Sequence, residues 1–219
     1  MSLFPIFSPV AAPDVVLAFV AATLRGSGGT STTYSGHAIG TASSGRIVVV
    51  GQGAWGGGTQ PAITSMTIGG ISASSLIAQS NASVAMRSEI WAAAVPTGTT
   101  ADIVINWDNT TSDSNIAVYE MTEASITATD TAVSTANPAA LTIDCEAGGA
   151  IVTEAGNNNG SVTWTWANIT ESHDSPGSGS RSYSGASDNF ATTQTSLAIT
   201  GTPSTSGDEC GCAVAFGKA

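Results

Sequence analysis

The chain consists of short runs rich in β-branched and aromatic residues, separated by clusters of Gly, Ser, Asn and Thr. The runs recur at roughly 8–12-residue intervals, and helical periodicity does not persist over a window of about 11 residues. Closely spaced short strands with turn residues between them are typical of an antiparallel sandwich or barrel. The sequence therefore predicts an all-β fold, an antiparallel β-sandwich with jelly-roll-like connections. Two tandem immunoglobulin-like units are the alternative.

The expected strands follow the β-rich runs, and only residues 90–95 (IWAAAV) have a helical propensity. In the first half the expected strands are 15–24, 46–51, 63–68, 75–79, 84–95, 102–107 and 116–121. In the second half they are 141–145, 150–154, 161–166, 189–193, 196–200 and 210–216.

The two halves of the chain are weakly alike. GRIVVVGQGA from Gly45 is echoed by GAIVTEAGNN from Gly149, TSMTIGGIS by VTWTWANIT, and IAVYEM by CAVAFG. The number of residues that separates the two members differs from pair to pair. A β-unit used twice would produce this pattern, and so would the general similarity of β-strand sequences. We predict one sandwich over residues 14–219 with a weak internal duplication, about 14–123 and 138–217. Residues 123–137 are the boundary if there are two units.

Residues 1–13 form a separate segment, which we call the arm. Pro5, Pro9 and Pro13 recur every four residues and disfavour both helix and central strand. An extended apolar arm cannot bury its own side chains, so it must lie on its own sandwich or on a neighbouring subunit. The residues expected to form this interface are Leu3, Phe4, Ile6, Phe7 and Val10.

Net charge and hydropathy argue against several classes of binding partner and against export. Five Lys and Arg residues against sixteen Asp and Glu give a formal net charge of −11, which opposes nucleic-acid binding. The apolar run 15–24 is shorter than the roughly 20 residues of a membrane-spanning helix. The first basic residue is Arg25, so the N-terminus lacks the positive region of a secretory signal. We expect no nucleic acid, no membrane and no export by the general route.

Two loop-like motifs carry weak chemical signals. Gly51 to Gly56 match GxGxxG after a strand, but Gly, Thr, Gln and Pro follow where a dinucleotide site needs a helix. We interpret the motif as a glycine-rich connection between strands. Asp108 and Asp113 could supply oxygen ligands to Ca²⁺, but the Gly and Glu of an EF-hand loop are missing. A solvated turn is the preferred interpretation.

The cysteines and two tryptophans are expected in the core. Cys145, Cys210 and Cys212 alternate with polar or small residues on one face of their strands, and neither histidine has the spacing of a zinc site. Trp164 and Trp166 share a face with Val162, which favours core over the alternative of an exposed platform for a sugar ring. No catalytic constellation stands out, so we predict no cofactor and no enzymatic activity.

Most of the chain from about residue 14 onward resembles uncharacterised all-β proteins encoded among the structural genes of tailed bacteriophages and prophages. The similar segments in the first half are GRIVVVGQGAW, ITSMTIGGISAS, EIWAAAVPTGTTADIVINW and IAVYEMT. Those in the second half are GGAIVTEAG, SVTWTWANITES, SYSGASDNFATTQTSLAITGTPS and CAVAF. These motifs consist of turns, strand starts and core aromatics, so the resemblance supplies no catalytic residue.

The resemblance implies a virion component that is made in the host cytoplasm. Together with the apolar arm, it leads us to expect a capsid decoration or cement protein that docks on the major capsid protein, on copies of itself (for example as a trimer), or on both. The alternative is a tail-associated module that binds a receptor or a carbohydrate.

Overall fold

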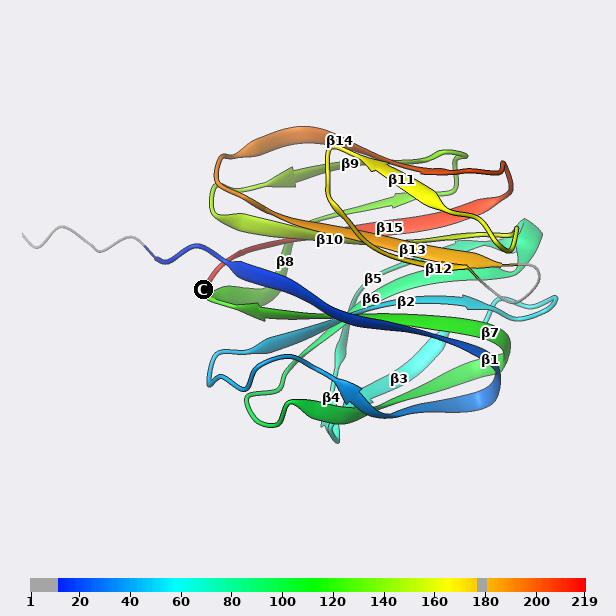
Figure 1. Ribbon diagram of the computed structural model, residues 1–219, viewed down its shortest axis with the longest axis horizontal. Coiled ribbons are helices and arrows are strands. Elements are labelled where there is room, and N and C mark those ends of the chain that lie inside the picture. Colours follow the sequence, from blue (N-terminus) through cyan, green and yellow to red (C-terminus); the bar gives the residue numbers. More distant parts are fainter. Residues whose placement is uncertain (1–11, 177–180) are drawn as a thin grey trace, which may run out of the picture.

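The computed structural model describes residues 12–176 and 181–219 (Figure 1). The arm interface expected at Leu3, Phe4, Ile6, Phe7 and Val10 lies outside the described residues. Within them the chain is nearly all strand, every strand pair is antiparallel, and the expected all-β sandwich is confirmed. This part of the chain contains no helix long and apolar enough to cross a membrane.

We divide the strands into an N-terminal half, β1–β7, and a C-terminal half, β8–β15. The N-terminal half contains β1 (Val16–Ala38), β2 (Ile47–Trp55), β3 (Ile63–Ile68), β4 (Ile71–Ser72), β5 (Ser74–Asn81), the 3₁₀ turn η1 (Ala82–Val84), β6 (Met86–Ala94) and β7 (Thr100–Thr122). The C-terminal half contains β8 (Ala124–Ser134), β9 (Ala139–Cys145), β10 (Gly149–Asn157), β11 (Trp164–Ala167), β12 (Glu171–Pro176), β13 (Ser182–Phe190), β14 (Gln194–Pro203) and β15 (Glu209–Lys218).

No sheet mixes strands of the two halves. In the N-terminal half, a large sheet in the order β1-β7-β2-β6-β5 continues into a small one, because β1 and β7 bend together and pair again beside β3. In the C-terminal half, the large sheet has the order β12-β13-β10-β15-β8 and the small sheet the order β11-β14-β9. Figure 1 shows the halves stacked, with their large sheets facing each other.

Each half has its own core, and a further core lies between the halves. Val48, Val50 and Ile105 belong to the core of the N-terminal half, while Ile143 and Ile151 belong to that of the C-terminal half. The residues that alternate with these on the large sheets fill the core between the halves. They include Ile47, Val49, Tyr119, Val152, Val214 and Phe216.

This stacking explains why β2, β10 and β15 are buried almost throughout. Each lies in a large sheet that is covered on one side by a small sheet and on the other by the opposite half. By contrast, β9 lies in an outer sheet, and its residues alternate strictly between buried and exposed. Strands that are covered on both faces consist of continuous apolar runs, which is the pattern of VVV and IV in β2 and β10.

One expectation from the sequence is wrong in detail. The expected strands 102–107 and 116–121 are one strand, β7, so Asp108 to Asp113 lie within a strand and not in a turn. Register shifts between β1 and β7 around Gly26 and Gly29 let the two strands bend together from the large sheet into the small one. The expected strand 84–95 is confirmed as β6, which includes residues 90–94. The segment 123–137 contains the edge strand β8.

The GxGxxG motif also differs from its expected role as a loop. Gly51 and Gly53 lie inside β2, and the connection begins only at Gly56. A Cβ atom on Gly51 would lie 2.8 Å from Glu154 Oε2, and one on Gly53 would lie 2.2 Å from Tyr183 Cδ1. Both contacts are with the C-terminal half. These glycines therefore allow the large sheets to approach closely, which is a common reason for glycine inside a strand.

Substitution of Gly53 by Ala tests this close approach. The added methyl group would overlap the ring of buried Tyr183, and overpacking of this kind costs about 1–3 kcal/mol. Gly45→Ala is the matched control, because a Cβ there meets nothing within 4 Å. We expect urea denaturation to show a loss of stability for Gly53→Ala and a small change for Gly45→Ala. Equal effects would contradict the packing described.

Candidate functional site

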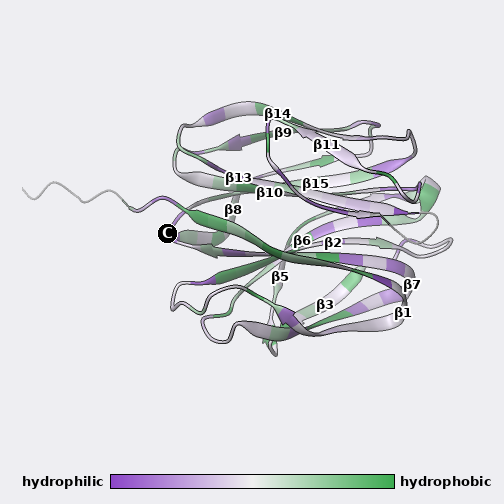
Figure 2. Cartoon of the chain, viewed as in Figure 1, coloured by the Kyte–Doolittle hydropathy of each residue, from purple (hydrophilic) through white to green (hydrophobic). Residues whose placement is uncertain are grey.

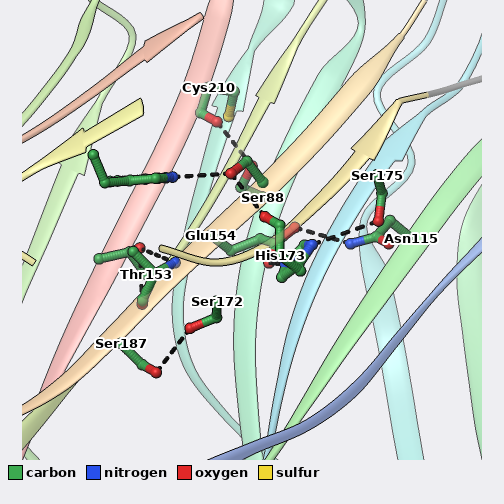
Figure 3. A network of polar contacts seen from close by, with 12 residues as sticks. Ser88, Asn115, Thr153, Glu154, Ser172, His173, Ser175, Ser187 and Cys210 are labelled. Carbon is green, nitrogen blue, oxygen red and sulfur yellow. Dashed lines mark hydrogen bonds and ion pairs between the residues drawn. The ribbon is translucent and has the colours of Figure 1, made fainter. Parts of the chain in front are cut away.

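A polar network lies between the two large sheets, beside the apolar core that they share (Figure 3). Glu154 of β10 is fully buried. Its Oε2 atom lies 3.3 Å from His173 Nε2 on β12, and its Oε1 atom accepts a hydrogen bond of 3.1 Å from Asn115 Nδ2 on β7. The carboxyl group thus connects a strand of the N-terminal half to two strands of the C-terminal half.

The surroundings of Glu154 determine its protonation. Burial raises the pKa of Glu154 above its ordinary value, and the nearby His173 and the hydrogen bond from Asn115 offset part of that rise. His173 is itself buried, and the ring of Phe19 on β1 stacks against it with 5.9 Å between centroids. A buried carboxyl group with so few partners favours its neutral form.

Ser175, His173 and Glu154 superficially resemble a nucleophile, a base and an acid. The Ser175 Oγ atom lies 3.5 Å from His173 Nδ1, at the outer limit of a hydrogen bond. Both residues are on β12, two positions apart, and both are buried. Ser184 Oγ, which donates to the His173 carbonyl and accepts from Trp166 Nε1, connects the network to the outer small sheet. These hydrogen bonds connect the stacked sheets to one another.

A second contact between the halves lies at one end of the interface. The guanidinium carbon of Arg181 is 3.9 Å from the ring centroid of Trp55, the last residue of β2. Arg181 Nη1 also donates to the carbonyl of Asn158. A hollow of about 280 Å³ opens beside the pair, with Gly57 and Gly58 among its lining residues. Aromatic and cationic groups at a hollow can hold a polar ligand.

The surface at the base of the arm is apolar. Val16 is 59% exposed and Phe19 is 37% exposed, and Figure 2 shows the first part of β1 in the green of hydrophobic residues. A hollow of about 200 Å³ adjoins Val16. Its lining residues are Val16, Ala18, Thr41, Ser43, Glu120 and Thr122. Exposed apolar area that follows an apolar arm in the sequence is typical of a surface that binds another protein.

The structure places the other candidate residues in the core. Cys145, Cys210 and Cys212 are buried free thiols, as predicted. Burial raises the pKa of Cys145 to about 11 and that of Cys210 to about 12, which makes both poor nucleophiles. Among the described residues, no group of three or more His, Cys, Asp or Glu is placed to hold a metal ion.

The two tryptophans do not form an exposed platform. Trp164 is buried, as predicted, and Trp166 is half-buried and stacked on it with 6.1 Å between ring centroids. Their indole nitrogens donate to Ser182 and Ser184 of β13. The network around Glu154 was not predicted from the sequence. Its only signal was an isolated Glu inside the apolar run AIVTEAG.

No family model, no curated protein and no solved structure matches the chain.

Replacement of Trp164 by Ala tests its role in the core. We expect a loss of about 3–5 kcal/mol in the free energy of unfolding, since a buried Trp is removed. Trp166→Ala, at a half-buried position, should cost less. Urea denaturation followed by circular dichroism measures both. Unchanged stability of Trp164→Ala together with lost glycan binding would support the platform interpretation instead.

The network predicts how stability depends on pH. Because the pKa of Glu154 is raised by folding, its stabilising contribution is complete below its ordinary pKa of 4.5 and is lost as the pH rises through the folded value. Glu154→Gln cannot ionise, so its stability relative to the wild type should increase from pH 5 to pH 8. Other carboxyl groups with raised pKa values, such as Asp113, are present in both proteins and cancel. A difference that is independent of pH would contradict the assignment.

Proposed function

We propose that the protein is a non-enzymatic structural component of a bacteriophage virion, a capsid decoration or cement protein that docks on the major capsid protein through its arm. The observation that carries this proposal is the exposed apolar side chain of Val16 beside the adjoining hollow, at the start of β1. Phe19 is also partly exposed, but it lies on the opposite face of β1, against Tyr119 and His173. In the sequence, Val16 follows shortly after the apolar residues Leu3, Phe4, Ile6, Phe7 and Val10 of the arm. Apolar side chains that are exposed next to an apolar segment of the sequence suit a protein partner.

The body of the molecule suits the same role. Its large sheets are covered on both faces, so the described residues form a stack of sheets without a free face on the central strands. A net charge of −11 disfavours contact with packaged nucleic acid. The resemblance of residues 14 onward to proteins of phage structural genes supports a virion location. Docking on copies of itself in a homo-oligomer would use the same exposed apolar side chains.

The second candidate is a tail-associated module that binds a receptor or a carbohydrate. The observation that favours it is the hollow beside Trp55 and Arg181, where an indole and a guanidinium group lie next to glycine-rich backbone. A Trp55→Ala variant that lost adhesion to host cells, while the arm proved dispensable, would favour this candidate over a decoration protein.

Deletion of residues 1–13 tests the proposed function. Burial of an apolar side chain contributes roughly 1.5–3 kcal/mol, so an arm buried on a capsid would supply much of the affinity. We expect the truncated protein to keep its melting temperature and to lose binding to undecorated capsids. If the arm instead covers its own sandwich, the melting temperature falls and binding persists. Persistent binding would refute the docking role of the arm.

A further inference from the structure

The same strand order occurs in both halves. Read from the edge strand that begins each half, the large sheets are β1-β7-β2-β6-β5 and β8-β15-β10-β13-β12. The small sheets are β1-β7-β3-β4 and β9-β14-β11, which match apart from the two-residue strand β4. The long strand β1 thus corresponds to β8 and β9, and β7 corresponds to β14 and β15. If β1 and β7 are each counted as two strands, as their counterparts are, and the two-residue strand β4 is left out, each half has eight strands among the described residues. The first, eighth, third and sixth of them then lie side by side in the large sheet, which is the strand order of one sheet of a jelly roll.

The sequence echoes fall on these corresponding strands. GRIVVVGQGA and GAIVTEAGNN form the third strands, β2 and β10. TSMTIGGIS covers β3, and VTWTWANIT covers β11. IAVYEM and CAVAFG are in the last strands, β7 and β15. Similar sequence and equal strand position therefore coincide at three separate places.

The halves also pack as two copies of one unit would pack around a twofold axis. The first edge strand of the N-terminal half, β1, contacts β12 and β13 at the far edge of the opposite sheet. The first edge strand of the C-terminal half, β8, contacts β5, which is the strand that corresponds to β12. Such a reciprocal contact, in which strand i meets strand j and j meets i, is typical of an isologous interface. Elsewhere the relation is approximate, because β15 lies closer to β5 and β6 than β7 lies to β12 and β13.

The two places where one half ends and the other begins are alike. Thr122 ends β7 and pairs with Val16 at the start of β1, while Lys218 ends β15 and pairs with Ala124 at the start of β8. One residue, Glu123, joins the halves, and its carbonyl accepts a hydrogen bond from the backbone of Ala219.

The C-terminal end of the chain also lies close to Asp14, just before the start of β1. The Lys218 Nζ atom is 2.7 Å from Asp14 Oδ1. The C-terminus therefore lies where a second link, equivalent to Glu123, would join the C-terminal half to β1.

We infer that the chain is a covalently joined pair of like jelly-roll units, and that the large-sheet face of each unit is a recognition surface for a second copy of such a unit. In this protein the N-terminal and C-terminal halves occupy each other's faces. Gly53 against Tyr183, Gly156 against Met86 and Gly185 against Tyr119 make the two faces complementary. The inference does not depend on the proposed role in a virion.

A circular permutant tests the equivalence of the two links. Ala219 is joined to Asp14 through a short Gly/Ser linker, and the chain is opened between Glu123 and Ala124. The reference is the linear chain without residues 1–13. We expect the permutant to fold, with a melting temperature within about 4 °C of the reference, because both openings leave the same two units intact. A permutant that fails to fold would overturn the equivalence.

A nicked full-length chain provides a second measurement. A protease site inserted at Glu123 is cut in the folded protein, and the two fragments are followed by size-exclusion chromatography with light scattering. We expect the fragments to stay together, to separate in urea, and to re-form the complex when the urea is diluted. Labelled N-terminal fragment from one preparation should then pair with unlabelled C-terminal fragment from another. Fragments that separate without denaturant would overturn the recognition surface.

Discussion

The direct contact between the two large sheets determines most of what is observed in this protein. Strands β2, β10 and β15 are buried on both faces only because each half covers the large sheet of the other. Such close contact requires residues without side chains at the points where Tyr183, Met86 and Tyr119 cross the interface, and glycines occupy these points. Burial of apolar surface in the shared core is the main favourable contribution to holding the halves together.

The buried carboxyl group of Glu154 lies within this contact and affects how the two sheets are aligned. Glu154 loses hydration on burial and recovers only part of that free energy from His173 and Asn115. Apolar residues at these positions would hold two sheets together equally well. The directed contacts add a preferred alignment, because Glu154 meets its partners only when β7, β10 and β12 are in register.

The sequence predicted the fold class and many strands, because alternation and turn residues are local signals. In β9 the alternation of Leu141, Ile143 and Cys145 indicated which side chains are buried. The bend of β7 could not be predicted, because the polar segment from Asp108 to Asp113 is typical of a turn and is held as a strand only by pairing with β1 and β2. The contact of His173 with Glu154 was equally hidden, since these residues come from strands that are brought together only by the sheet order.

The central claim is that the two halves form one cooperative body through their large sheets. Native-state hydrogen exchange measures this directly, because it gives a free energy of opening for each amide. The account predicts that the slowest amides of β2 and of β10 open with the same free energy, equal to that of global unfolding, and that Gly53→Ala lowers both together. Amides of β10 and β15 that exchange through a separate opening of much lower free energy, unaffected by Gly53→Ala, would contradict it.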